Sequence, residues 1–360
     1  MRYISRNCIR PDAVLAKPIL GPSGEVLLSA GVKMKASYIK RMERMGIAGA
    51  YVNDPVSEDL EIVNALSDEL KTQAVQGITA AFSQAVKGRG NTQASGAALM
   101  KTAEQIVEEI LAHGDVMLNL FDMKVFDSYT FFHSVSVTVL SVVIGLGLGF
   151  SRLMLVSTAY AALLHDIGKV LISAHIINKP SPLTPEEFEI VKKHPQDGYN
   201  YIKEKFSLTV SELSARAVLE HHERVDGTGY PAGKTGDVIT PIGKVIAVAD
   251  VYDALVSDRP YRKGVFPVEA MEYIQGNCGT LFDFDVVNVF SQKAALFPVG
   301  SCVLLSNGLT ALVMQTFEGL TQRPLVKVFM DGDIRLGEPY LVNLSEEALD
   351  VTVVAQVDIA

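Results

Sequence analysis

The feature that most constrains this chain is a series of histidines and aspartates set into otherwise apolar sequence. Six of its seven histidines lie between residues 133 and 250. The series consists of His133, His165, Asp166, His194, His221, His222 and Asp250. Neutral imidazoles and carboxylates are ligands that suit iron, manganese and zinc, and two adjacent metal ions need a carboxylate to bridge them. The pattern predicts a metal site, with Asp166 as the natural bridge.

The doublets His165-Asp166 and His221-His222 indicate the fold that such a site requires. Neighbouring side chains on a helix diverge by roughly a third of a turn, so both members of a doublet reach one cluster only when it lies between several packed helices. An α-helical bundle core is therefore expected. A single histidine is more often a surface or hydrogen-bonded core residue than a ligand, but that interpretation leaves two polar doublets in apolar helices unexplained.

Residues 184–187, TPEE, have the pattern of a helix start. Thr184 is the expected N-cap, Pro185 takes the first helical position and Glu187 can close a capping box. We expect this helix to end at His194, which places that histidine at a helix terminus facing the cluster.

A chain of 360 residues exceeds the usual size of one core, so more than one domain is expected. The hydrophobic pattern divides the chain into four parts. Short β-like runs around one short helix predict a small N-terminal α+β module at residues 1–55. Two amphipathic helices predict a helical linker or hairpin at residues 56–115. The all-α bundle is expected at residues 116–295, and two hairpin turns predict a small C-terminal β domain at residues 296–360. The predicted fold class is thus mainly α.

Charge and cysteine content narrow the class of protein. With a formal net charge of −9 and a pI near 5.3, the chain lacks the basic surface that non-specific binding of a nucleic-acid polymer requires. Its three cysteines form no CxxC pair and its N-terminus shows no secretory signal, which together predict a cytoplasmic protein. Residues 131–150 are apolar enough to suggest a membrane span, but they begin beside His133 and are interpreted as a buried core helix.

Three segments carry a resemblance to a known family. They read AALLHDIGKV at residues 161–170, EHHERVDGTGYP at residues 220–231 and AVADVYDALVSDRPYR at residues 247–262. In this order they resemble the HD-GYP family, a branch of the HD metal-dependent phosphohydrolases. The resemblance implies hydrolysis of cyclic di-GMP to linear pGpG, in some members continuing to GMP. The alternatives are a phosphohydrolase for another cyclic dinucleotide or nucleotide, and a non-catalytic cyclic di-GMP receptor or scaffold.

The resemblance also implies which residues bind metal. By motif, the ligands are His133, His165, Asp166, His194, His221, His222 and Asp250. In family members with three metals a Glu stands four residues before the first histidine, whereas this chain has Tyr129 there. Two divalent ions are therefore expected, iron or manganese by resemblance. Bridged by Asp166, they would activate a water molecule and hold the phosphate for in-line attack.

Four further side chains are expected to meet the substrate. Lys169 follows His165 by one helical turn and could hold the phosphate or protonate the leaving oxygen. Arg259 and Arg262 carry guanidinium groups suited to clamping phosphate oxygens or stacking on guanine. Tyr230 lies in the glycine-rich DGTGYP turn, which by resemblance sets substrate specificity or binds signalling-protein partners. Helices in the 56–115 segment could also pair in a homodimer.

Overall fold

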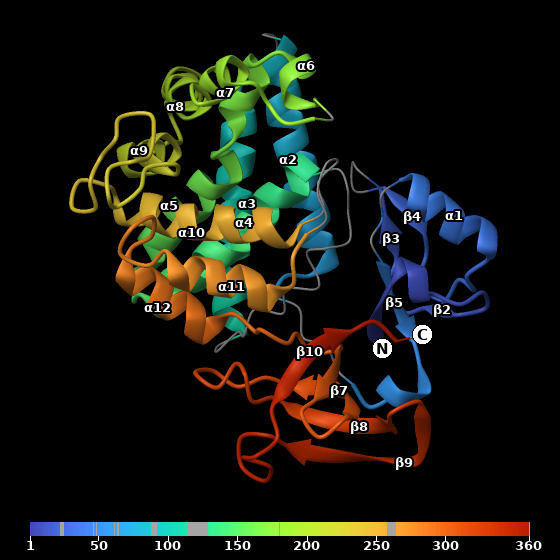
Figure 1. Cartoon of the computed structure of the whole chain (residues 1–360). Coiled ribbons are helices and arrows are strands. Elements are labelled where there is room, and N and C mark those ends of the chain that lie inside the picture. Colours follow the sequence, from blue (N-terminus) through green and yellow to red (C-terminus); the bar gives the residue numbers. More distant parts are fainter. Residues whose placement is uncertain are drawn as a thin grey trace.

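The computed structural model describes residues 1–21, 25–45, 47, 49–60, 62, 65–87, 92–113, 129–179, 181–257 and 264–359. It is mainly helical, and Figure 1 shows a helical body beside two smaller parts that contain the strands. Both ends of the chain lie close together at the junction of these two smaller parts (Figure 1). The C-terminal strands predicted from the sequence form a sheet, as expected.

The helical body is built around α4 (Tyr129–Gly147), which packs against α5 (Arg152–Leu164) and α10 (Pro241–Val256). All side chains of α4 from residue 133 to 145 are buried. Apart from His133 these side chains are apolar or carry only small hydroxyl groups, and a helix without a charged face is stable only inside a core, which explains this central position. The other helices described in the body are α2 (Asp68–Lys87), α3 (Thr92–Ala112), α6 (Ala174–Ile177), α7 (Pro185–Val191), α8 (His194–Lys205), α9 (Glu212–Glu220), α11 (Pro267–Gly276) and α12 (Phe284–Lys293).

One hydrophobic core runs through the whole body. It includes Ile78 of α2 and Ile106 of α3 together with Val143 of α4 and Ile246 of α10. The two helices of the 56–115 segment therefore bury their apolar faces against the bundle. Packing of this kind supplies most of the stability of such helices, because isolated helices are marginal in water.

The predicted start of α7 is confirmed in detail. The Thr184 hydroxyl accepts a hydrogen bond from the Glu187 backbone N–H, and the Glu187 carboxylate accepts one from the Thr184 N–H. The predicted end was wrong, because α7 stops at Val191 and His194 begins α8 instead. The histidine still lies at a helix terminus, as expected.

One helical run among the described residues, Arg152–Leu171, meets the length and composition of a membrane span, and 72% of its most apolar window is buried inside the protein. It comprises α5, the following turn and the 3-10 helix η4 (Ile167–Leu171). Such burial is typical of a core helix. Of the segment that the sequence singled out, residues 131–150, the part up to Gly147 belongs to the shorter central helix α4.

The C-terminal strands form an antiparallel sheet in the order β10-β6-β7-β8-β9. Asn307-Gly308 joins β6 to β7 and Asp331-Gly332 joins β8 to β9, which confirms both predicted hairpins. Gly308 has a φ of +85°, a backbone conformation that favours glycine. The strands are β6 (Cys302–Leu305), β7 (Leu309–Gln315), β8 (Leu325–Asp331), β9 (Ile334–Asn343) and β10 (Val353–Val357).

The N-terminal part contains two small sheets around one helix, α1 (Ala36–Arg44). Met42 of α1 packs with buried residues of the strands, including Leu15 and Val52. The strands are β1 (Arg2–Ser5), β2 (Val14–Leu15), β3 (Ile19–Leu20), β4 (Val26–Leu28) and β5 (Gly49–Asn53), with the 3-10 turns η1 (Arg6–Cys8) and η2 (Pro55–Ser57). The sheets have the orders β1-β5-β2 and β3-β4.

Candidate metal centre

The histidines and aspartates of the predicted cluster converge in the helical body. His133 comes from α4, Asp250 from α10, and His194 is the first residue of α8. Nε2 of His133 lies 3.1 Å from Oδ1 of Asp250, although 117 residues separate them in the chain. Packing of α10 on α4 brings these two side chains together.

The two doublets lie at helix ends, whereas the sequence predicted them within helices. His165 and Asp166 stand between α5 and η4, and His221 and His222 follow directly after α9. His165 and His221 cap these helices and keep right-handed helical dihedral angles. Both members of each doublet still reach the cluster, since His165 shares a ligand group with Asp166 and His221 shares one with His222.

Ligand-type atoms of these side chains lie close enough to share ions. They form three groups in which all atoms are within 4.8 Å of one another: His194, His221 and His222; His133, His165 and Asp250; and His165, Asp166 and His221. The two oxygens of Asp166 face different histidines, with Oδ1 3.4 Å from His194 Nε2 and Oδ2 3.5 Å from His165 Nε2. This is the arrangement that a bridging carboxylate requires.

Three of the histidines are oriented by the same local device. In each, Nδ1 contacts the backbone carbonyl oxygen three residues earlier: His165 to Ala162 (2.7 Å), His194 to Val191 (2.8 Å) and His221 to Val218 (2.7 Å). Because a carbonyl oxygen only accepts hydrogen bonds, Nδ1 carries the proton and Nε2 presents a lone pair. The free carbonyls near a helix C-terminus supply these acceptors.

The lone pairs meet inside the cluster. Nε2 of His194 and Nε2 of His221 lie 3.3 Å apart, and both are acceptors in the tautomers just described. Two facing lone pairs repel each other unless a cation lies between them. Two further atoms in the described cluster, His165 Nε2 and Asp166 Oδ1, are buried without a hydrogen-bond partner. Since unpaired buried polar atoms are costly, these residues fit divalent metal ions well.

His133 is held by a carboxylate instead of a carbonyl. Its Nδ1 lies 2.7 Å from Oδ2 of Asp253, and both side chains are buried. Metal-binding histidines commonly donate their second N–H to such a carboxylate. Sequence reasoning missed Asp253, although it follows Asp250 by three residues on α10 and therefore lies on the same helix face.

The protonation states match this geometry. Burial raises the pKa of Asp166, but the Lys169 ammonium and the surrounding imidazoles outweigh burial and hold that pKa well below its usual value. Burial lowers the pKa of His194 to about 3. For His133, burial lowers the pKa, but hydrogen bonds to Asp250 and Asp253 outweigh it and raise the pKa to about 9. The site therefore offers ionised carboxylates and several neutral imidazoles.

Lys169 reaches the cluster from η4. Its Nζ donates to Oδ2 of Asp166 at 2.6 Å, while 27% of its side chain remains exposed. The preceding Gly168 lies against the backbone of His194, where a Cβ atom would collide with the His194 carbonyl. The glycine thus allows η4 to approach the start of α8 closely enough to place the lysine at the cluster.

The DGTGYP loop closes one side of the site. The Tyr230 ring lies 4.7 Å from the His222 ring at a tilt of 30°, and the Tyr230 N–H donates to the His222 carbonyl. Gly227 has a φ of +80°, as a turn of this composition requires. The Tyr230 ring thus lies beside the histidine cluster, and its predicted contact with the substrate stays a prediction.

Two buried carboxylates that sequence reasoning did not assign hold this loop. Glu223, 3% exposed, accepts hydrogen bonds from the backbone N–H groups of Ala232 and Lys234. Glu220 accepts from the Lys234 ammonium and the Thr240 N–H. The only sequence signal for them was their position, because Glu220 directly precedes the histidine doublet and Glu223 directly follows it. The segment that carries His221 and His222 therefore also anchors the chain directly after the loop.

Two predicted substrate-binding residues, Arg259 and Arg262, lie outside the described residues. The side chain of Tyr129 does too, so the predicted absence of a third metal stays a prediction.

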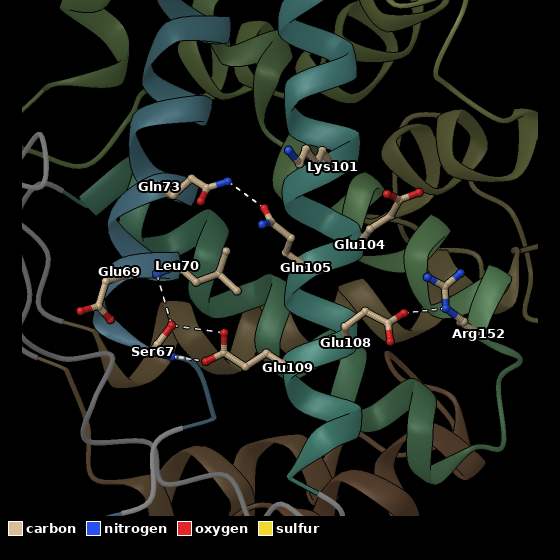
Figure 2. A pocket seen from close by; sticks show the side chains of 10 residues that line it. All are labelled: Ser67, Glu69, Leu70, Gln73, Lys101, Glu104, Gln105, Glu108, Glu109 and Arg152. Atoms are coloured by element: carbon tan, nitrogen blue, oxygen red, sulfur yellow. Dashed lines mark hydrogen bonds and ion pairs between the residues drawn. The ribbon is translucent and has the colours of Figure 1, made fainter.

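A separate open groove of about 680 Å³ lies between α2 and α3 (Figure 2). It is lined by polar side chains such as Gln73 and Gln105, and by Glu108, which pairs with Arg152. None of the cluster residues lines it.

Comparisons with known proteins agree with the site. The HD domain family model matches residues 115–286. A cyclic di-GMP phosphodiesterase of Pseudomonas aeruginosa is 34% identical over 284 residues, which cover 77% of this chain and 67% of that protein. A cyclic di-GMP phosphodiesterase of Thermotoga maritima is 39% identical over 194 residues, which cover 53% of this chain and 52% of that protein.

A solved structure also resembles the chain. An HDG"Y"P protein from Bdellovibrio bacteriovorus superposes with a TM-score of 0.50 and 16% identity, covering 80% of this chain and 97% of that one. At this identity the likeness concerns the fold. The chain belongs to the HD-domain family. Within that family of metal-dependent phosphohydrolases, its HDIGK, HHE and DGTGYP motifs make it an enzyme of the HD-GYP type.

Proposed function

We propose that this chain hydrolyses cyclic di-GMP to linear pGpG with the help of two divalent metal ions, iron or manganese. The observation that carries the proposal is the convergence of imidazole Nε2 lone pairs and two carboxylates on one buried point. The relatives named as cyclic di-GMP phosphodiesterases supply the substrate. The chain spans only about half of the Thermotoga relative, so the activity of the whole protein is part of the proposal.

The ions would be held by the predicted ligands, with Asp166 as the bridge. When bound, they supply Lewis acidity at the phosphate and lower the pKa of the attacking water. The ligands are His133, His165, Asp166, His194, His221, His222 and Asp250. The carbonyl and carboxylate partners of the Nδ1 atoms keep the imidazoles in one tautomer, so little reorganisation is needed on binding.

Lys169 is assigned the handling of the substrate phosphate. Its ammonium is anchored to Asp166 at 2.6 Å and still has donors free for a second partner, because an ammonium group carries three N–H bonds. It could hold a non-bridging phosphate oxygen or deliver a proton to the leaving alkoxide. Arg259 and Arg262 are proposed to clamp the substrate through phosphate oxygens or by stacking on guanine, and Tyr230 to face the substrate beside His222.

The first test is turnover of cyclic di-GMP by protein reconstituted anaerobically with Fe(II) or with Mn(II), beside a chelator-treated sample. We expect pGpG to appear only in the metal-loaded samples. Cyclic GMP-AMP in parallel tests the substrate, since faster hydrolysis of that nucleotide would contradict the proposed specificity. Binding of cyclic di-GMP without turnover in either metal would indicate a receptor instead.

The role of Lys169 needs its own variant. Lys169→Met should lower kcat by roughly a hundred-fold while leaving the bound metal in place, because a positioned acid typically contributes that much. Lys101→Met is the matched control, since Lys101 is an exposed lysine on α3 far from η4 in the chain. Equal kcat for the two variants would remove Lys169 from the mechanism.

A further inference from the structure

Phe188 is an aromatic residue whose exposure the fold does not explain. It lies on α7, and 46% of its side chain is exposed. Its ring lies 6.4 Å from the Tyr230 ring in an edge arrangement, with an interplanar angle of 82°. The Tyr230 ring connects it to the metal cluster, because that ring lies 4.7 Å from the His222 ring.

The three rings His222, Tyr230 and Phe188 form a continuous series from the cluster outward. The first pair lies 4.7 Å apart and the second pair 6.4 Å apart, measured between ring centroids. Glu223 holds the backbone that follows Tyr230, through the N–H groups of Ala232 and Lys234. An exposed aromatic surface of this kind matches the flat face of a nucleobase.

A cation lies over the outer ring. Nζ of Lys192 is 5.5 Å from the Phe188 ring centroid and 2.5 Å from Oε1 of Glu189. The Lys192 side chain is 30% exposed, and the Glu189 side chain is 66% exposed. Lysine donates well to O6 and N7 of guanine, whereas adenine presents an amino group in place of O6. The chemistry beside the ring therefore favours guanine.

We propose that Phe188 and Lys192 form a guanine subsite, in which one base of the cyclic dinucleotide stacks on Phe188 and accepts a hydrogen bond from Lys192. The assignment rests on the proposed function, because it places the scissile phosphate at the metal cluster. It makes α7 a determinant of specificity in addition to the DGTGYP loop.

The test is the steady-state kinetics of Phe188→Ala and Phe188→Tyr on cyclic di-GMP. Loss of a stacked base weakens affinity by roughly ten-fold or more, so Phe188→Ala should raise KM by about that factor with kcat within about two-fold. Phe188→Tyr should keep the KM of the wild-type protein, because tyrosine retains the aromatic ring. Ile190→Ala is the matched control, since Ile190 is 40% exposed on the same helix and points about 200° away around the axis.

Lys192→Met tests the choice of base. We expect it to raise KM for cyclic di-GMP by roughly ten-fold and to leave the inhibition constant of cyclic di-AMP unchanged. The preference for guanine over adenine then falls by the same factor. Unchanged KM in Phe188→Ala, or equal effects of Lys192→Met on both nucleotides, would overturn the subsite.

Failure of the proposed function gives a different result. If wild-type protein binds cyclic di-GMP but does not hydrolyse it, the phosphodiesterase proposal fails, and the dissociation constants of the same variants then support or overturn the subsite. If wild-type protein binds no cyclic dinucleotide, both proposals fall.

Discussion

The metal cluster and the junction of the two chain ends both bury charge, but they neutralise it differently. At the junction, the Arg2 guanidinium is 2% exposed and donates to Asp54 Oδ2 at 2.8 Å and to the Ile359 carbonyl at 3.0 Å. In the cluster, lone pairs of His194 and His221 face each other, and Asp166 Oδ1 has no hydrogen-bond partner. At the junction the carboxylate pairs with the buried guanidinium, whereas in the cluster Lys169 pairs with one oxygen of Asp166 and the facing imidazole lone pairs have no cation between them.

This difference separates a structural cluster from a functional one. A buried charge with an internal partner strongly stabilises the fold as long as both partners remain, because removing one leaves the other unpaired. A buried set of unpaired acceptors destabilises the free protein and stabilises the loaded one. Substitutions in the cluster should therefore mainly lower activity, whereas substitutions at the junction should mainly lower stability.

The largest expected effect is on activity at the cluster. Asp166→Ala should lower turnover by roughly a thousand-fold or more and strip metal from the protein, because the shared bridge is lost. Metal analysis and pGpG formation measure both, with the exposed Asp333→Ala as control. An active variant that keeps its full metal content would contradict the bridge.

At the junction the largest effect should be on stability. Arg2→Met leaves the Asp54 carboxylate, 13% exposed, without its partner and should cost about 3 kcal/mol in unfolding free energy, with kcat unchanged. Urea denaturation checks this, and the exposed Arg10→Met should cost little. The double variant Arg2→Met with Asp54→Asn should recover part of the loss. Equal denaturation midpoints for the Arg2 and Arg10 variants would show that the pair is not stabilising.

The pH dependence of stability should also distinguish the regions in the metal-free protein. The folded-state pKa of His194 is about 3, below its usual value of 6.5, so below pH 6.5 the unfolded chain binds a proton that the folded chain does not. Stability should therefore fall as the pH drops, by about 2 kcal/mol between pH 6.5 and 5 for this histidine. Asp54, whose pKa lies below 3.8, stays ionised over that range.

Urea denaturation of chelator-treated protein at the two pH values measures this dependence, and His194→Gln should reduce it. His133 acts in the opposite direction, since its pKa is raised to about 9 and its contribution is lost only above pH 6.5. A metal-free protein equally stable at pH 6.5 and 5 would contradict burial of neutral imidazoles.

The smallest expected effect is at the carboxylate behind His133. Asp253→Asn should weaken metal affinity by roughly ten-fold, because the partner of a metal-binding imidazole tunes its basicity and orientation. Competition with a coloured chelator measures the affinity, and the exposed Asp237→Asn is the control. An affinity equal to that of the control would show that Asp253 only fills space.

Much of the candidate site could be predicted from the sequence, because its chemistry depends on residue type. The histidine and aspartate series, the Thr184 capping box and the Asn307-Gly308 hairpin all follow from local patterns, and the structure contains each of them. The buried character of α4 followed from a segment that is nearly free of charge and begins beside His133. These features are local in the chain or set by the identity of single residues.

Other features depended on contacts between distant segments, and only the tertiary structure decided them. The position of the doublets at helix ends fixes which nitrogen of His165 and His221 carries the proton, because the acceptor is a free carbonyl of the preceding turn. The partnership of Asp253 with His133 required α10 to pack on α4, and that of Arg2 with Ile359 required the chain ends to meet. The sequence by itself determined which groups can bind metal, and the packing decided which of their atoms face one another, since hydrogen-bond geometry depends on positions and not on residue type.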